Sequence, residues 1–193
     1  MPKERAPSVE PSPLRADAKR NRAKLIETAA LAFTEQGAAA SLEDIARRAG
    51  VGIGTLYRHF PSREHLVESV YRRELELLAT SARALMQEEE PAKAVEEWMN
   101  RFVSYMAAKR GMASSLKLLF TSNSALFADG TRLLHTAFGE LLDNAVKADA
   151  VKADIEAADV LNALFGIYSI PEGPDWRHRA HRIVRLVMDG LRR

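Results

Sequence analysis

The segment from Ser41 to Phe60 concentrates side chains that can bind a polyanion. It carries hydroxyl, phenol, guanidinium and imidazole groups, all of which can donate hydrogen bonds to phosphate oxygens. Glycines at positions 52 and 54 let a backbone approach a phosphate closely, and the positive end of a helix favours that contact. The residues that we expect to remain free for binding are Ile53, Gly54, Thr55, Tyr57, Arg58 and His59.

Two short helices must position these side chains. Ser41 is a typical N-cap, and it precedes apolar residues at helical spacing, namely Leu42, Ile45, Ala46 and Ala49. Gly50 ends this helix, and a second short helix turns Leu56 and Phe60 inward. Two helices joined by a tight glycine-containing turn form a helix-turn-helix, whose second helix can enter the major groove of DNA. One alternative stays open at this point, because any three-helix core can contain such a turn.

A basic cluster precedes this segment and consists of Arg15, Lys19, Arg20, Arg22 and Lys24. Residues 1–73 carry 13 lysines and arginines against nine acidic residues, whereas residues 74–193 carry 15 against 17. A basic front is typical of a protein end that meets a polyanion. The cluster either binds phosphates or solvates a helix end, and its position beside the helix-turn-helix favours phosphates.

Other candidate chemistry is weaker. The glycines at 50, 52 and 54 follow a helix, and Tyr57 stands where a dinucleotide fingerprint needs its third glycine. His178 and His181 lie one helical turn apart and could ligate a metal, but a solvated arginine-rich face explains them better. The chain has no cysteine and no motif of a serine hydrolase, zinc protease or P-loop. We therefore expect no enzyme, no metal and no cofactor.

The rest of the chain predicts an all-α fold. Proline and charge mark residues 1–14 as a disordered arm. A helix over about 16–36 precedes the two short ones, a long helix runs from there to about 88, and further helices follow over about 92–109, 113–121, 129–147, 156–168 and 175–191. We expect a helix-turn-helix domain over 15–73 and a larger helical domain over 74–193. No apolar run is long enough to span a membrane and no signal peptide is evident, which predicts a cytoplasmic protein.

The larger domain offers apolar residues for a core and for a ligand pocket. Most such residues belong to a core, yet concave sites are themselves chiefly apolar with a few polar groups. The candidate pocket residues are Trp98, Met99, Phe102, Tyr105, Met106, Phe120, Asn123, Phe127, His135 and Phe138.

The last two helices present apolar faces that a small bundle cannot hide fully. One face consists of Val160, Leu161, Leu164 and Phe165, and the other of Ile183, Leu186, Val187 and Leu191. We expect an isologous homodimer built from these helices.

A longer run contains the helix-turn-helix and resembles the DNA-binding signature of TetR-family transcriptional regulators. From Ser41 to Leu66 the chain reads S-L-E-D-I-A-R-R-A-G-V-G-I-G-T-L-Y-R-H-F-P-S-R-E-H-L, and the similarity extends over about 21–71. The core L-Y-x-H-F, followed by a basic residue at 63 and an acidic one at 64, is a specific match.

The resemblance implies roles for individual residues. Thr55, Tyr57, His59 and Arg63 would hold the DNA backbone, Ile53 and Gly54 would approach base edges, and Ser41 would cap its helix beside a phosphate. Glu43 stands near a position where some members reach a base with a basic residue, which suggests that base readout relies on the recognition helix. The layout of the rear helices implies a ligand-binding and dimerisation domain.

We therefore expect a dimeric repressor that binds a palindromic operator and is released by a small, hydrophobic effector. A transcriptional activator or nucleoid-type DNA binder is the alternative within the same class. A protein-interaction module without DNA binding is the alternative from another class. Salt-dependent binding to a palindromic duplex would separate the first expectation from the last.

Overall fold

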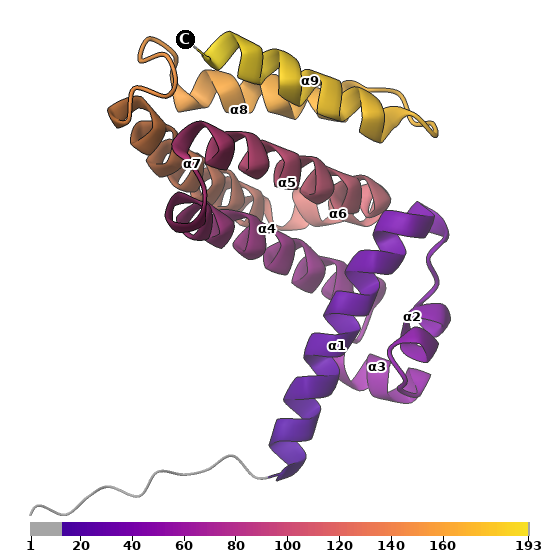
Figure 1. Cartoon of the computed structure of the whole chain (residues 1–193). Coiled ribbons are helices and arrows are strands. Elements are labelled where there is room, and N and C mark those ends of the chain that lie inside the picture. The colour runs from indigo at the N-terminus through magenta and orange to yellow at the C-terminus, as the bar shows by residue number, and fades with distance from the viewer. Residues whose placement is uncertain (1–12, 193) are drawn as a thin grey trace, which may run out of the picture.

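The computed structural model describes residues 13–192, and within this range every regular element is helical (Figure 1). The elements are α1 (Pro13–Gln36), α2 (Leu42–Arg48), α3 (Ile53–His59), α4 (Arg63–Glu88), α5 (Pro91–Gly111), α6 (Ala113–Ser122), α7 (Ser124–Lys147), α8 (Ala157–Phe165) and α9 (Trp176–Leu191), with short 3-10 helices η1 (Gly37–Ala39) and η2 (Gly166–Ser169). The predicted all-α class, with an N-terminal helix-turn-helix and a larger helical part behind it, is confirmed.

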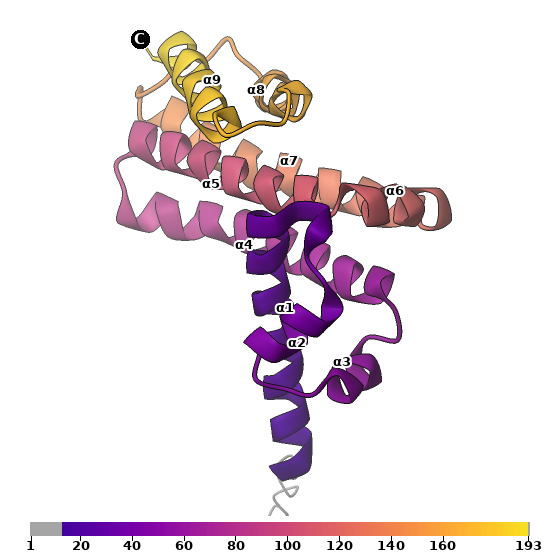
Figure 2. The ribbon, with the colours of Figure 1, turned by 90° about the vertical axis from the view of Figure 1, so that its right-hand side faces the viewer.

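The helices form two parts that share α4. Helices α1, α2 and α3 lie together at one end, and α4 leads from them into a bundle with α5, α6 and α7. Helices α8 and α9 cover α7 and α5 on the opposite side of that bundle (Figure 2). Because α4 runs unbroken from Arg63 to Glu88, it passes through the predicted domain boundary at 73/74, which stays a prediction.

The core of the larger part is aromatic and fully buried. Trp98 has no exposed surface, packs 4.8 Å from Phe138 between ring centroids, and donates a 3.0 Å hydrogen bond from Nε1 to the carbonyl of Leu78. Burying an indole with its N–H satisfied avoids the cost of an unpaired donor. Helix α5 therefore lies at the centre of the bundle.

Some element ends differ from the sequence expectation. Helix α7 begins at Ser124 instead of 129, because the side chain of Asn123 caps it by accepting from the N–H of Leu126 at 3.3 Å. The helix expected over 156–168 changes to the 3-10 helix η2 at Gly166. The predicted arm lies outside the described residues except for 13 and 14, which already belong to α1. Within residues 13–192 no helix is both long and apolar enough to cross a bilayer.

Candidate nucleic-acid interface and cavity

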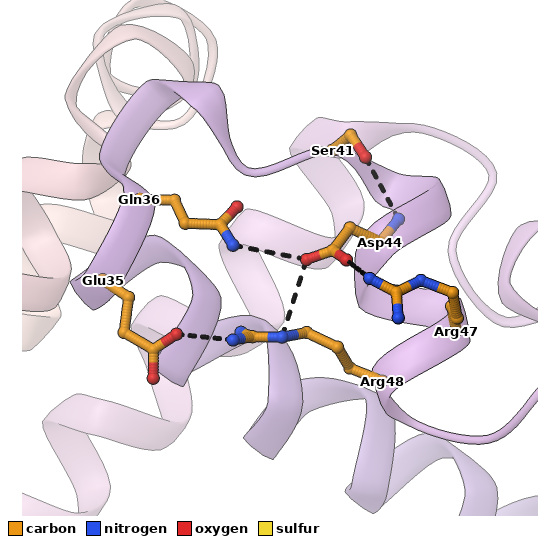
Figure 3. Close-up of polar contacts among 6 residues, drawn as sticks. All are labelled: Glu35, Gln36, Ser41, Asp44, Arg47 and Arg48. Atoms are coloured by element: carbon orange, nitrogen blue, oxygen red, sulfur yellow. Dashed lines mark hydrogen bonds and ion pairs between the residues drawn. The ribbon is translucent and has the colours of Figure 1, made fainter.

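Helix α2 begins at a side-chain cap that is tied to the end of α1. The hydroxyl of Ser41 accepts from the N–H of Asp44 at 3.0 Å, as the sequence predicts. The Asp44 carboxylate in turn accepts from Gln36 at 3.4 Å and pairs with Arg47 and with Arg48, while Arg48 reaches Glu35 at 2.6 Å (Figure 3). Exposed pairs of this kind contribute little singly, but together they fix the start of α2 against α1.

The turn between α2 and α3 depends on one glycine conformation. Gly50 has φ +70°, in the left-handed region that residues with a side chain rarely adopt. Its N–H bonds to the carbonyl of Arg47 at 3.0 Å, and the N–H of Val51 bonds to that of Ala46 at 3.0 Å, which satisfies the last carbonyls of α2. This turn redirects the chain into α3.

Helix α3 buries one face and exposes the other. Leu56 and Phe60 are buried, whereas Ile53 and Tyr57 expose 37% and 45% of their surface. Gly54 and Arg58 are exposed, and Thr55 and His59 are half-buried. The six predicted contact positions between 53 and 59 thus lie on or beside one accessible face.

Two of the predicted phosphate-binding arginines already have partners within the fold. Arg63 donates a 2.6 Å hydrogen bond to the carbonyl of Ala40, and its guanidinium lies 5.0 Å from the ring centroid of Phe33. Arg22 donates to the hydroxyl of Ser69 at 3.1 Å and lies 5.1 Å above the ring of Phe60. Their phosphate contacts stay predictions, since a guanidinium has five donors and these contacts use few of them.

The other basic residues of α1 differ in their surroundings. Arg20 pairs with Asp17, whereas Lys19 is exposed. The side chain of Arg15 lies outside the described residues.

His178 and His181 stand in an exposed stretch, and His181 contacts Asn100 at 3.0 Å. Among the described residues, no group of three or more histidines and carboxylates is arranged to hold a metal ion.

A cavity of about 690 Å³ lies between α4, α5, α6, α7, the end of α8 and the η2 segment. Its apolar wall consists of Leu116, Phe120, Phe127, Leu134 and Phe165. Tyr71, Tyr105 and Lys109 also line it, and burial raises the pKa of both phenols, so they remain protonated donors. Helix α7 approaches α4 closely at Gly130, where an added side chain would overlap Leu75 and touch the Tyr71 hydroxyl.

The cavity includes only three of the ten residues predicted for a pocket, namely Tyr105, Phe120 and Phe127. Five others lie in the closed core with no exposed surface, because α5 is packed between α1, α4, α7 and α9: Trp98, Met99, Phe102, Met106 and Phe138. Asn123 serves as the cap of α7, and His135 is half-buried outside the cavity. The sequence analysis missed Tyr71 and Lys109, although Lys109 continues the face of Tyr105 one turn further along α5.

Comparison with known proteins identifies the family. A model of the N-terminal region of bacterial regulatory proteins of the tetR family matches residues 25–70. A second model, of the C-terminal domain of SbtR-like transcriptional regulators, matches residues 90–193, which is more than half of the chain. The chain belongs to the TetR family of transcriptional regulators. Its helix-turn-helix is therefore the DNA-binding unit of this TetR-family protein.

Solved structures of TetR-family regulators are similar over almost the whole length. A TetR transcriptional regulator from Streptomyces coelicolor is 43% identical, with a TM-score of 0.79 over 89% of this chain and 98% of that one. A TetR transcription regulatory protein from Mycobacterium vanbaalenii is 35% identical, with a TM-score of 0.73 over 94% and 100%. An HTH-type transcriptional regulator of Staphylococcus aureus (strain USA300) is 41% identical over 68 residues, which span 35% of this chain and only 37% of that relative.

The faces predicted for dimerisation of this TetR-family chain are partly used within one protomer. Val160, Leu161, Leu164 and Leu191 are at most 3% exposed, because α8 packs on α7 and α9 packs on α5. Phe165 lines the cavity. The apolar residues that remain on the outer face of α9 are Ile183 and Val187, which are half-buried, and Leu186, which is 72% exposed.

Proposed function

We propose that this TetR-family protein is a ligand-responsive repressor that binds a palindromic operator as a homodimer. The observation that carries the proposal is the accessible face of α3, with Ile53 and Tyr57 exposed above a buried Leu56 and Phe60. At the N-terminus of such a helix, the exposed apolar side chain of Ile53 can contact the edges of bases, and the phenol of Tyr57, one turn later, can donate a hydrogen bond to a phosphate. A dimer would place two such helices in successive major grooves, about 34–36 Å apart, and so block polymerase.

The outer face of α9 supports the dimer. Leu186 is 72% exposed and stands between the half-buried Ile183 and Val187 on the same helix. An isologous contact through α8 and α9 would cover this apolar strip on both protomers at once.

Helix α4 supports regulation by a ligand. Arg63 at its start holds Phe33 and the carbonyl of Ala40 in the DNA-binding part, and Tyr71, about 12 Å further along the same helix, lines the cavity. A ligand that shifts α4 would change the distance between α3 of one protomer and α3 of the other protomer in the dimer. The ligand can shift the equilibrium only by its differential affinity for the two conformations.

Titration of labelled DNA from the region upstream of the gene tests the proposal, with an inverted repeat from that region and a scrambled duplex compared at several salt concentrations. We expect Tyr57→Phe to weaken binding to both duplexes by about 1.5–3 kcal/mol, because a bond to a charged phosphate is lost. Ile53→Ala is expected instead to change the ratio of the affinities for the inverted repeat and the scrambled duplex.

Tyr168→Phe is the matched control. Tyr168 is 47% exposed, almost as much as Tyr57, but it lies in η2, where it lines the cavity, and not in α3, so without a ligand its hydroxyl should not affect the affinity for DNA. Unchanged affinity in Tyr57→Phe, or an equal loss in Tyr168→Phe, would contradict the assignment of α3 to DNA.

A further inference from the structure

The side-chain amine of Lys109 lies against two aromatic rings of the cavity. The ammonium of Lys109 lies 5.9 Å from the ring centroid of Tyr105 and 6.0 Å from that of Phe165. Within residues 13–192 no hydrogen bond or ion pair holds this ammonium, and the two ring faces are its only polar attraction. Burial lowers the pKa of Lys109, with no neighbouring carboxylate to offset it.

The charges around the cavity are of one sign. Lys109 and the exposed Lys117 both line it, and no aspartate or glutamate is among the described residues that do so. Removing a cation from water without a partner is costly, and charged side chains that are buried in folded proteins are nearly always paired. An anionic group placed here would restore the charge balance.

The remaining wall is apolar and large. Phe120 and Phe127 lie 5.1 Å apart between ring centroids, and Phe127 lies 5.1 Å from Tyr71, so the wall offers several aromatic faces. A volume of about 690 Å³ is within the range of sites that enclose small organic molecules.

We propose that the cavity binds an amphipathic organic acid, whose anionic group is held by Lys109 and whose apolar body lies against Phe120 and Phe127. The proposal rests on the proposed role of the cavity as the effector site and specifies the chemical class of the effector. Cationic and uncharged apolar compounds of the same size are bound more weakly, because neither can pair with the ammonium.

A matched pair of fluorescent dyes tests this without DNA. Anilinonaphthalene sulfonate carries one negative charge, and phenylnaphthylamine has the same apolar body without it. We expect the intact protein to bind one molecule of the sulfonate per chain, and Lys109→Met to weaken that binding about ten- to a hundredfold while changing the affinity for phenylnaphthylamine less than about twofold. Lys109→Arg should retain most of the sulfonate affinity, since it keeps the charge.

Lys147→Met is the control. It removes an exposed lysine at the far end of α7 from Phe127, outside the cavity, and circular dichroism verifies that all variants are folded. Absence of saturable sulfonate binding, an equal loss for both dyes in Lys109→Met, or an equal loss in Lys147→Met would overturn the proposal. Failure of the unliganded protein to bind any operator would instead refute the repressor function and leave the dye selectivity intact.

Discussion

Gly111 of α5 lies directly against the main chain of Phe33 of α1. A side-chain carbon at position 111 would overlap the carbonyl group of Phe33 and come within 3.3 Å of the Cα of Gly37. Since α1 belongs to the DNA-binding part and α5 to the part that carries the cavity, this contact determines how closely the two parts approach.

Gly111→Ala is expected to lower the free energy of unfolding by about 2–3 kcal/mol, because backbone atoms cannot move aside as a flexible side chain can. Urea denaturation followed by circular dichroism measures the change. Gly139→Ala, on α7 with no atom within 4 Å of the added carbon, is the control and should be neutral or stabilising by about 0.5–1 kcal/mol. Equal stability of the two variants would contradict the close contact.

Arg63→Ala is expected to destabilise the protein as well as to weaken DNA binding. The substitution removes the hydrogen bond to the carbonyl of Ala40 and the contact with the Phe33 ring, which together contribute about 2 kcal/mol. Arg58→Ala, at an exposed position on α3, should affect DNA binding alone. If urea denaturation gives the same free energy of unfolding for Arg63→Ala and Arg58→Ala, Arg63 has no structural role.

Leu186→Asp is expected to convert the proposed dimer to a folded monomer. A carboxylate within the apolar strip of α9 would have to be desolvated on both protomers of an isologous contact, weakening association a hundredfold or more, or about 3 kcal/mol. Light scattering measures the mass. Leu118→Asp on α6, where the leucine is 61% exposed, should leave the dimer intact, and a Leu186→Asp protein that stays dimeric would place the interface elsewhere.

Lys109→Met is expected to raise the free energy of unfolding at neutral pH by up to about 1 kcal/mol, because it removes a partly buried charge without a partner. The pKa of Lys109 is lowered in the folded protein, so the unfolded chain binds more protons between the two pKa values and the stability of the wild type rises with pH through that range. The advantage of the variant should therefore shrink at alkaline pH. Urea denaturation of both proteins at neutral and alkaline pH measures the difference, and an advantage independent of pH would exclude the charge as its cause.

Rules that involve only neighbouring residues in the sequence were sufficient to predict the helix-turn-helix. The cap at Ser41, the left-handed turn at Gly50 and the buried pair Leu56 and Phe60 all follow from residue type and helical spacing, because each depends on neighbours within a few positions. The face of α3 that stays accessible follows from the same spacing. The late start predicted for α7 was wrong, because the side chain of Asn123 caps the helix and lets it begin at Ser124.

The position of the cavity and the exposure of the outer face of α9 could not be predicted from the sequence, because both depend on how the helices pack across one another. Trp98 and Tyr105 lie about two turns apart on the same apolar face of α5, so helical spacing cannot distinguish Trp98, which packs in the closed core, from Tyr105, which lines the cavity. Likewise Leu164 and Leu186 both belong to apolar helix faces in the sequence, yet Leu164 on α8 is fully buried where α8 packs on α7, and Leu186 on α9 is 72% exposed. Periodicity along one helix specifies which residues share a face, but only the packing of several helices decides whether that face meets another helix, a hollow or the surface.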